Sequence, residues 1–220
     1  MRDANRIFYD CRREDETAVG RQNADLCRRW LRSQKIDFKS IHANGDGSLR
    51  LNLSGTDASD LSPLTLLPLK HLCLAGCWRI KDFTPLLKMK LIWLNLTRTG
   101  ITDLSPLRNL PLKYLSLCRT KVVTLSPLRQ LPLKTLDIRS TRIASLLPLR
   151  RMPIEELYFF SNRIKRGMTL LRSIGTLTRL NSQQPKEFWK IYKRRVHVPA
   201  SPFNALIIFR NLRNMLAGKQ

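Results

Sequence analysis

The residue types that most often carry catalysis or bind metals are few in this chain and far apart. The three histidines, His42, His71 and His197, fall in separate segments. His71 and Cys73 would share one face of a strand, and with Cys77 they form the tightest grouping of possible metal ligands. Cys77, however, stands where a repeated pattern already places a Cys, Thr or Asn. We therefore expect no metal site and no cofactor.

Motifs with a known chemical mechanism are also missing from the sequence. There is no phosphate-binding G-x-x-x-x-G-K-[ST] loop, no G-x-G-x-x-G, no zinc-binding H-E-x-x-H and no nucleophile elbow G-x-S-x-G. The protein is therefore predicted not to be an enzyme.

The sequence does contain a short phrase that recurs at a fixed period. Its five prolines are spaced 22, 21, 21 and 21 residues apart. A constant period in this range is typical of a solenoid, in which one structural unit stacks on the next. The five copies are LSPL at 61–64, FTPL at 83–86, LSPL at 104–107, LSPL at 125–128 and LLPL at 146–149.

Each copy is accompanied by a second pattern in fixed phase. Two apolar residues alternate with other residues, as in a strand with one buried face. A small polar or thiol residue follows three positions later, and an aliphatic residue comes after it. The apolar pairs are Leu51/Leu53, Leu72/Leu74, Leu94/Leu96, Leu115/Leu117, Leu136/Ile138 and Leu157/Phe159. The small residues are Thr56, Cys77, Thr99, Thr120, Thr141 and Asn162.

This double pattern resembles the leucine-rich repeat family, L-x-x-L-x-L-x-x-N/C/T-x-I, in its short internalin-like class. The resemblance implies an α/β solenoid with a parallel β-sheet on the concave face, short helical turns on the convex face and helical caps at the ends. In the turns, Ser or Thr before proline predicts an N-cap followed by the first helical residue. The expected N-caps are Ser62, Thr84, Ser105 and Ser126, with Asp60, Asp82 and Asp103 placed to bind the same amide groups.

The ends of the chain differ in character from the repeats. Helical spacing of apolar residues predicts a helix up to Ser33, and the Asn-Gly-Asp-Gly turn at 44–47 predicts a hairpin of 35–42 with 48–53. The P-x-x-F-W-K-x-Y segment starting at Pro185 is similar to the ends of arrays attached to bacterial serine/threonine kinases, although no kinase signature is present. The predicted segments are an N-terminal helical cap at 1–34, about six repeats at 35–164, a partial repeat and cap at 165–195, and a linker with an amphipathic helix at 196–220.

Composition restricts the setting in which the protein acts. The 220 residues carry a formal charge of +24, and 43% of them are hydrophobic. No run of apolar residues reaches the roughly 18–20 that a membrane helix needs, and the first residues lack the apolar core of a signal peptide. Five cysteines, odd in number and irregularly spaced, argue against a disulfide framework. We expect a monomeric bacterial protein of the cytoplasm.

The concave strand face is the expected binding surface of such an array. Residues that alternate with the leucines would point there, and Trp93 and Tyr114 would be cross-strand neighbours about 5 Å apart. Exposed aromatic residues beside Arg and Asn are typical of protein-binding hot spots. A capping segment that covers part of this face is the alternative reading. The predicted partner-binding residues are Trp93, Asn95, Tyr114, Asp137, Arg139, Tyr158 and Phe160, with Arg98 and Arg119 at the rim.

Two further interpretations remain open from the sequence. Basic residues recur at equivalent repeat positions and are dense near the C-terminus, so they could bind a polyanion such as nucleic acid, though weakly, or could simply be solvated. The chain could also be a detached regulatory array of a kinase-like protein. The possible polyanion-binding residues are Lys70, Lys113, Lys134, Lys193, Arg194 and Arg195.

Overall fold

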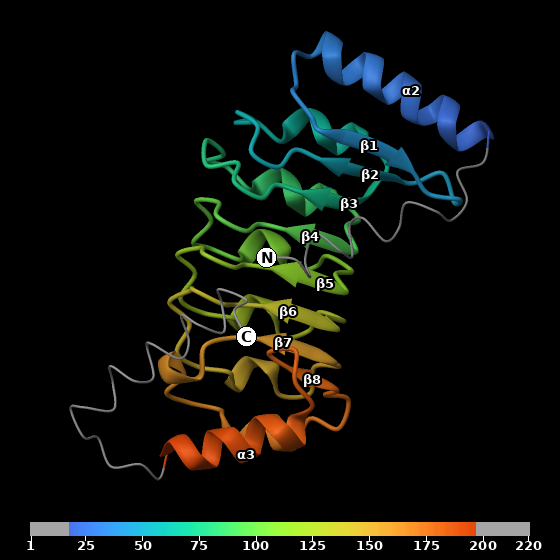
Figure 1. The fold of residues 1–220 in the computed structure, drawn as a ribbon. Coiled ribbons are helices and arrows are strands. Elements are labelled where there is room, and N and C mark those ends of the chain that lie inside the picture. The colour runs from blue at the N-terminus through green and yellow to red at the C-terminus, as the bar shows by residue number, and fades with distance from the viewer. Residues whose placement is uncertain (1–17, 197–220) are drawn as a thin grey trace, which may run out of the picture. The chain divides into compact units, whose positions relative to one another are not determined.

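The computed structural model describes residues 18–196, and most of them build on one eight-stranded sheet (Figure 1). The strands follow chain order, and each pairs with the next. The first pair is antiparallel and every later pair is parallel. The predicted α/β solenoid with a parallel sheet is therefore confirmed. The strands are β1 Ser40–Ala43, β2 Leu49–Asn52, β3 Leu69–Cys73, β4 Trp93–Asn95, β5 Tyr114–Ser116, β6 Thr135–Asp137, β7 Glu156–Tyr158 and β8 Arg179–Leu180.

A helix, α2 (Ala18–Ser33), lies beside β1 at the beginning of the sheet (Figure 1). Ala24 and Leu31 belong to the apolar stripe expected from the sequence, and both are buried. Arg28 donates a hydrogen bond from its guanidinium to the carbonyl oxygen of Ile41 at 2.9 Å, which joins α2 to β1. The helix and the antiparallel hairpin together cover an edge that would otherwise offer unpaired backbone groups.

The core lies between the sheet and the return limb of each repeat. The leucines of the alternating pattern, such as Leu94 and Leu115, are fully buried, and so are the leucines of the LSPL phrases, such as Leu107. Burying a leucine side chain contributes about 1.5–3 kcal/mol to folding. Because each repeat buries its leucines against the next repeat, the stack forms one continuous core.

Polar side chains close the turn at the end of each strand. Asn52 and Asn95 accept a hydrogen bond on Oδ1 from the backbone N–H two residues later, each at 2.9 Å. Three residues beyond the second apolar position, Thr99 donates from its hydroxyl to the carbonyl oxygen of Leu96 at 2.8 Å. The same hydroxyl-to-carbonyl bond is made by Thr56, Thr120 and Thr141. The small polar position thus pairs buried carbonyl groups that would cost about 1–3 kcal/mol if left alone.

The return limbs are short 3-10 helices, and their capping differs from the prediction. Ser62 and its equivalents are the first helical residues and make no N-cap side-chain bond. Instead, Asp60 accepts from the N–H of Ser62 at 2.8 Å, and Asp103 accepts from that of Ser105 at 2.9 Å. The carboxylate reaches the exposed N–H from two residues back, so the aspartates perform the role expected of the serines. The helices are Ser62–Leu66, Thr84–Lys88, Ser105–Leu107, Ser126–Leu128, Leu147–Leu149, Ser161–Arg163 and Thr169–Arg172.

The structure divides the C-terminal part of the chain between Ser182 and Gln183. The first unit ends soon after β8, which adds the partial repeat expected after the last full one. The second unit contains helix α3, Pro185–Val196, in which Phe188, Trp189 and Tyr192 form a cluster of ring contacts. The predicted segment 165–195 is therefore split between two units.

Some of the predicted segments cannot be compared with the structure. Residues 1–17 of the expected N-terminal cap lie outside the described residues. Residues 197–220, where an amphipathic helix is predicted, also lie outside them. In the described part of the chain, no helix is long and apolar enough to cross a membrane.

Candidate functional site

The outer face of the sheet collects the side chains that alternate with the buried leucines. Parallel strands pair residue by residue, so equivalent positions line up in rows across the sheet. One row runs through His71, Trp93, Tyr114, Thr135 and Glu156, and the next through Cys73, Asn95, Ser116, Asp137 and Tyr158. Five of the seven predicted partner-binding residues fall in these rows, and Arg139 and Phe160 directly follow β6 and β7.

Trp93 and Tyr114 are neighbours in this face, as the sequence predicts. Their ring centroids are 4.8 Å apart and their planes differ by only 7°. The prediction that they are exposed is wrong, because Trp93 is 5% and Tyr114 7% accessible. Each ring covers one face of the other, and Cys73 and Ala75 extend the same cluster. Burial also raises the pKa of Tyr114, so its hydroxyl stays protonated at neutral pH.

A chain of polar contacts lies farther along the face, on β6 and β7. Asp137 is buried and accepts two hydrogen bonds from the Arg139 guanidinium, at 3.0 Å on Oδ1 and 2.7 Å on Oδ2. The guanidinium carbon of Arg139 stands 5.2 Å from the ring centroid of Tyr158. The Tyr158 hydroxyl donates to Glu156 Oε2 at 3.1 Å. These contacts hold Arg139 in one orientation, and the Asp137 hydrogen bonds raise its pKa.

The predicted site residues therefore divide into two groups. Asn95 and Asp137 are 4% and 3% exposed, and both form the turn at the end of their strands. Arg139 and Tyr158 keep partly exposed surfaces, and Phe160 is 48% exposed. The accessible part of the candidate site is consequently centred on β6 and β7.

Sequence reasoning did not single out Glu156 as a site residue. Its carboxylate accepts from Tyr158 and also lies 3.6 Å from the guanidinium of Arg179 on β8. Two signals pointed to it: Glu156 stands two residues before Tyr158 in the alternating pattern, and it pairs with Thr135 across the sheet. The contact with Arg179 carried no such signal, because β8 departs from the repeat.

His71 occupies the same row as Trp93 and should make stability depend on pH. Burial, followed by the nearby Arg50 charge, lowers the pKa of His71 from 6.5 to about 4. The unfolded chain therefore binds a proton between about pH 6.5 and 4 that the folded chain does not, and stability falls as the pH falls through this window. Allowing for partial solvent exposure, we expect wild type to lose about 2 kcal/mol from this group between pH 7 and pH 4.

A His71→Gln variant isolates this contribution from that of the carboxylates. The free energy of unfolding should be measured by urea denaturation of both proteins at pH 7 and at pH 4.2. We expect the difference between variant and wild type to shift in favour of the variant at low pH. An equal difference at both pH values would contradict the assignment.

The basic residues proposed for polyanion binding do not form one open row. Lys70 pairs with Asp46, and Lys134 donates to Glu155 at 2.7 Å. Ile92 interrupts the row between Lys70 and Lys113, as the backbone bonds across the strands show. Lys193, Arg194 and Arg195 lie in α3, and their side chains are outside the described set.

The rim arginines occupy an unusual backbone position. Arg98 and Arg119 are exposed, with φ of 57° and 58°, at the turn position where the first two repeats have Gly55 and Gly76. Left-handed backbone disfavours every residue with a Cβ by about 1–2 kcal/mol. Their backbone N–H groups donate to the carbonyl oxygens of Cys118 and Arg139 in the following repeats, and this bonding holds the conformation.

The described residues show a recognition surface rather than a chemical centre. Among residues 18–196, no cluster of three His, Cys, Asp or Glu side chains is placed to hold a metal ion. Cys77 donates its thiol hydrogen to the carbonyl oxygen of Leu53 at 2.9 Å, in agreement with the structural role expected of that position.

Comparison with solved structures places the fold. Internalin C2 from Listeria monocytogenes str. 4b F2365 is similar over 58% of this chain, with 31% sequence identity and a TM-score of 0.51. An internalin F of the same strain is similar over 58% of this chain, with 21% identity and a TM-score of 0.45. The matched parts span 58% and 45% of those two chains, less than two thirds of either. No protein-family model and no curated protein matches the sequence.

Proposed function

Because the chain has an internalin-like leucine-rich repeat fold, we propose that it is a non-catalytic scaffold that binds a partner protein through the concave face of its sheet. Leucine-rich repeats generally mediate protein binding. Stacked strands present side chains from several repeats on one surface, so a partner can contact many of them at once. The proposal concerns this chain alone, and the internalins support only its fold.

The single observation that carries the proposal is the arrangement around Arg139. Its guanidinium is fixed by Asp137 on one side and lies over Tyr158, yet about 31% of the side chain stays exposed. A side chain that is already ordered loses little conformational entropy when a partner binds. Arg and Tyr are among the residues that most often dominate binding energies. Phe160, nearly half exposed, adds apolar area next to them.

The proposed contact surface is smaller than the sequence suggested. Trp93 and Tyr114 are already buried, so exposed aromatic area comes from Tyr158 and Phe160. We propose that Arg139, Tyr158 and Phe160 form the centre of the interface, with Glu156 orienting Tyr158. Arg98 and Arg119 remain proposed rim residues.

The test compares two double variants that remove the same kinds of group from different faces. Arg139→Ala/Phe160→Ala changes the proposed site. Leu147→Ala/Arg150→Ala removes an arginine and a hydrophobic residue of 50% exposure from a return limb. The partner is first captured from a nuclease-treated lysate at about 0.3 M salt, where the Debye length is roughly 5–6 Å, and then purified. Its affinity for each protein is measured by calorimetry.

We expect the site variant to bind at least about 30-fold more weakly than wild type, since two hot-spot residues together contribute 2 kcal/mol or more. The return-limb variant should bind within about twofold of wild type. Equal losses in both variants, or a partner that neither variant affects, would count against a concave-face interface.

We further propose that the protein acts as a monomer in a reducing compartment, the cytoplasm of a bacterium. The support is the Cys77 thiol, which serves as a hydrogen-bond donor inside the stack and must be reduced to do so. Lysate fractionation under non-reducing conditions, with sedimentation analysis of the purified chain, tests both statements.

A further inference from the structure

The loops that follow β5, β6 and β7 carry an unusual concentration of positive charge. They span residues 118–126, 139–147 and 160–168 and contain no Asp or Glu. Their described basic residues alternate with buried turn residues, so several of them point outward from the same edge of the sheet. The exposed cations at this edge are Arg119, Lys121, Arg142, Arg163 and Lys165. We refer to these five residues as the basic edge.

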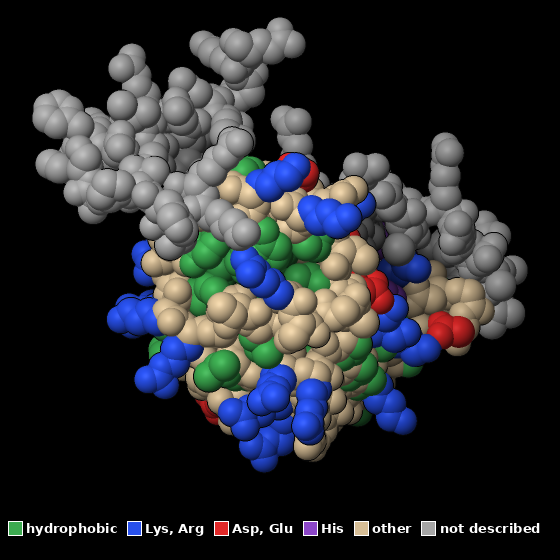
Figure 2. All heavy atoms as spheres, turned by 90° about the horizontal axis from the view of Figure 1, so that it is seen from below, with side chains coloured by type: hydrophobic (Ala, Val, Ile, Leu, Met, Phe, Trp, Pro, Cys, Tyr) green, Lys and Arg blue, Asp and Glu red, His purple; other side chains and the backbone are tan. Residues whose placement is uncertain are grey.

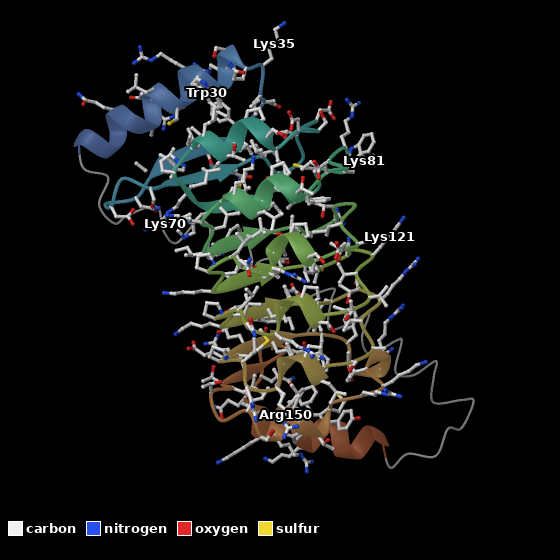
Figure 3. All side chains as sticks on the ribbon, turned by 180° about the vertical axis from the view of Figure 1, so that it is seen from behind. Trp30, Lys35, Lys70, Lys81, Lys121 and Arg150 are labelled. Atoms are coloured by element: carbon white, nitrogen blue, oxygen red, sulfur yellow. The ribbon has the colours of Figure 1, made fainter. Side chains whose placement is uncertain are left out.

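The basic edge lies where the strands end, opposite the lysines that begin the strands. Figure 3 shows Lys121 on one side of the stack and Lys70 on the other. The two sides differ in their partners. Lys70 and Lys134 pair with carboxylates, whereas among residues 18–196 none of the five basic-edge cations forms an ion pair.

Charge that serves only solubility has no reason to be confined to part of one edge. The equivalent loops of the first three repeats contain Asp60, Asp82 and Asp103, and Asp57 lies 3.4 Å from the Arg79 guanidinium. The acidic residues thus stop where the basic edge begins. In Figure 2 the visible face likewise carries many Lys and Arg side chains and few Asp and Glu.

The backbone holds the basic edge in a regular row. Arg142 N–H donates to the carbonyl oxygen of Val122 at 3.0 Å, and Lys165 N–H to that of Ala144 at 2.8 Å. Arg119 keeps a left-handed conformation that glycine adopts more readily, as at Gly76. A disfavoured residue at a position that tolerates glycine suggests that its side chain has a use.

We propose that the basic edge binds the phosphodiester backbone of a nucleic acid. Neighbouring repeats place their cations about 4.8 Å apart at the sheet, so the edge offers positive charge at a regular interval to a polymer with regular negative charge. Arginine predominates, and its planar guanidinium matches a phosphate with two parallel hydrogen bonds. An acidic protein would present carboxylates at irregular spacing. This site is distinct from the concave face and does not depend on the function proposed for it.

The test uses two triple variants with the same change in net charge. Arg119→Gln/Arg142→Gln/Arg163→Gln neutralises the basic edge. Arg108→Gln/Arg129→Gln/Arg150→Gln neutralises three exposed arginines that immediately follow the proline phrases. Binding of a fluorescent 20-nucleotide single strand of mixed sequence, and of the matching duplex, is measured by anisotropy from 50 to 200 mM salt. Circular dichroism checks that each variant keeps the wild-type fold.

We expect wild type to bind at 50 mM salt and the basic-edge variant to bind at least tenfold more weakly. Losing three phosphate contacts should also reduce the slope of log affinity against log salt by about 2 for the single strand. The control variant should change both quantities much less. An Arg→Lys version of the basic-edge triple should retain most of the salt slope, because the charges remain.

Three results would overturn the proposal. The first is no binding by wild type at 50 mM salt, and the second is an equal loss in both triple variants, which would indicate attraction by net charge alone. The third is displacement of the labelled strand by poly-glutamate as effectively as by unlabelled nucleic acid, which would indicate an acidic protein partner. The single-strand and duplex measurements show which form the edge prefers.

Discussion

Replacing Trp93 with alanine is expected to lower the free energy of unfolding by about 3–5 kcal/mol. Trp93 is 5% exposed and stacks on Tyr114 with a centroid separation of 4.8 Å. Truncating a buried tryptophan removes its apolar contacts and leaves a cavity, which together cost about this much. The lost ring contact accounts for about 0.5–1.5 kcal/mol of it. The effect should be large because β4 and β5 lie in the middle of the stack.

The chain supplies its own control for this substitution. Trp78 is 61% exposed on a loop, and Trp78→Ala should change stability by no more than about 0.5 kcal/mol. Trp93→Phe keeps a ring opposite Tyr114 and should lose less than Trp93→Ala. Urea unfolding followed by circular dichroism suits all three variants, since tryptophan fluorescence changes with the substitutions themselves. Similar losses for Trp93→Ala and Trp78→Ala would show that the stack does not stabilise the array.

Substitutions at Asp137 are expected to have the second-largest effect. Asp137→Asn keeps an oxygen for the N–H of Arg139, just as Asn95 does for Thr97 one strand pair earlier, but it loses the charged contact with the guanidinium. Because Arg139 is partly exposed, we expect a loss of about 1–2 kcal/mol. Asp137→Ala removes the turn acceptor as well and should cost about 2–4 kcal/mol.

A double-mutant cycle separates the ion pair from the turn. Asp137→Asn in an Arg139→Ala background should cost much less than in wild type, because the guanidinium is already absent. Unfolding in urea gives the four stabilities needed. If Asp137→Asn cost the same in both backgrounds, the pair would contribute nothing, and the ordering of Arg139 for partner binding would lose its support.

The sequence was sufficient to predict the sheet and its register. Prolines 21 or 22 residues apart, with leucines in constant phase, require equivalent residues to stack, and Trp93 and Tyr114 are accordingly paired in the structure. Periodicity identifies the face to which a side chain points. It does not reveal what covers that face, so the burial of these two rings was not predicted.

Contacts that depend on side-chain reach were also beyond the sequence. Both a serine and the aspartate two residues before it can cap a short helix, and only the structure shows that Asp60 and Asp103 accept the bonds. The pairing of Lys134 with Glu155 depends on how two long side chains extend from adjacent strands. The left-handed turn at Arg98 could not be read from an arginine, because that conformation usually signals glycine.

The constant register of the central strands bears on how such a gene can change. Trp93, Tyr114, Thr135 and Glu156 succeed one another at intervals of 21 residues and pair directly across the sheet. Unequal recombination that deletes or duplicates 21 codons in this region would therefore join two compatible repeat faces. Each event would shorten or lengthen the exposed face by about 4.8 Å while leaving every hydrogen-bond ladder intact. Lineages could thus change the size of the recognition surface in whole steps, without new core residues.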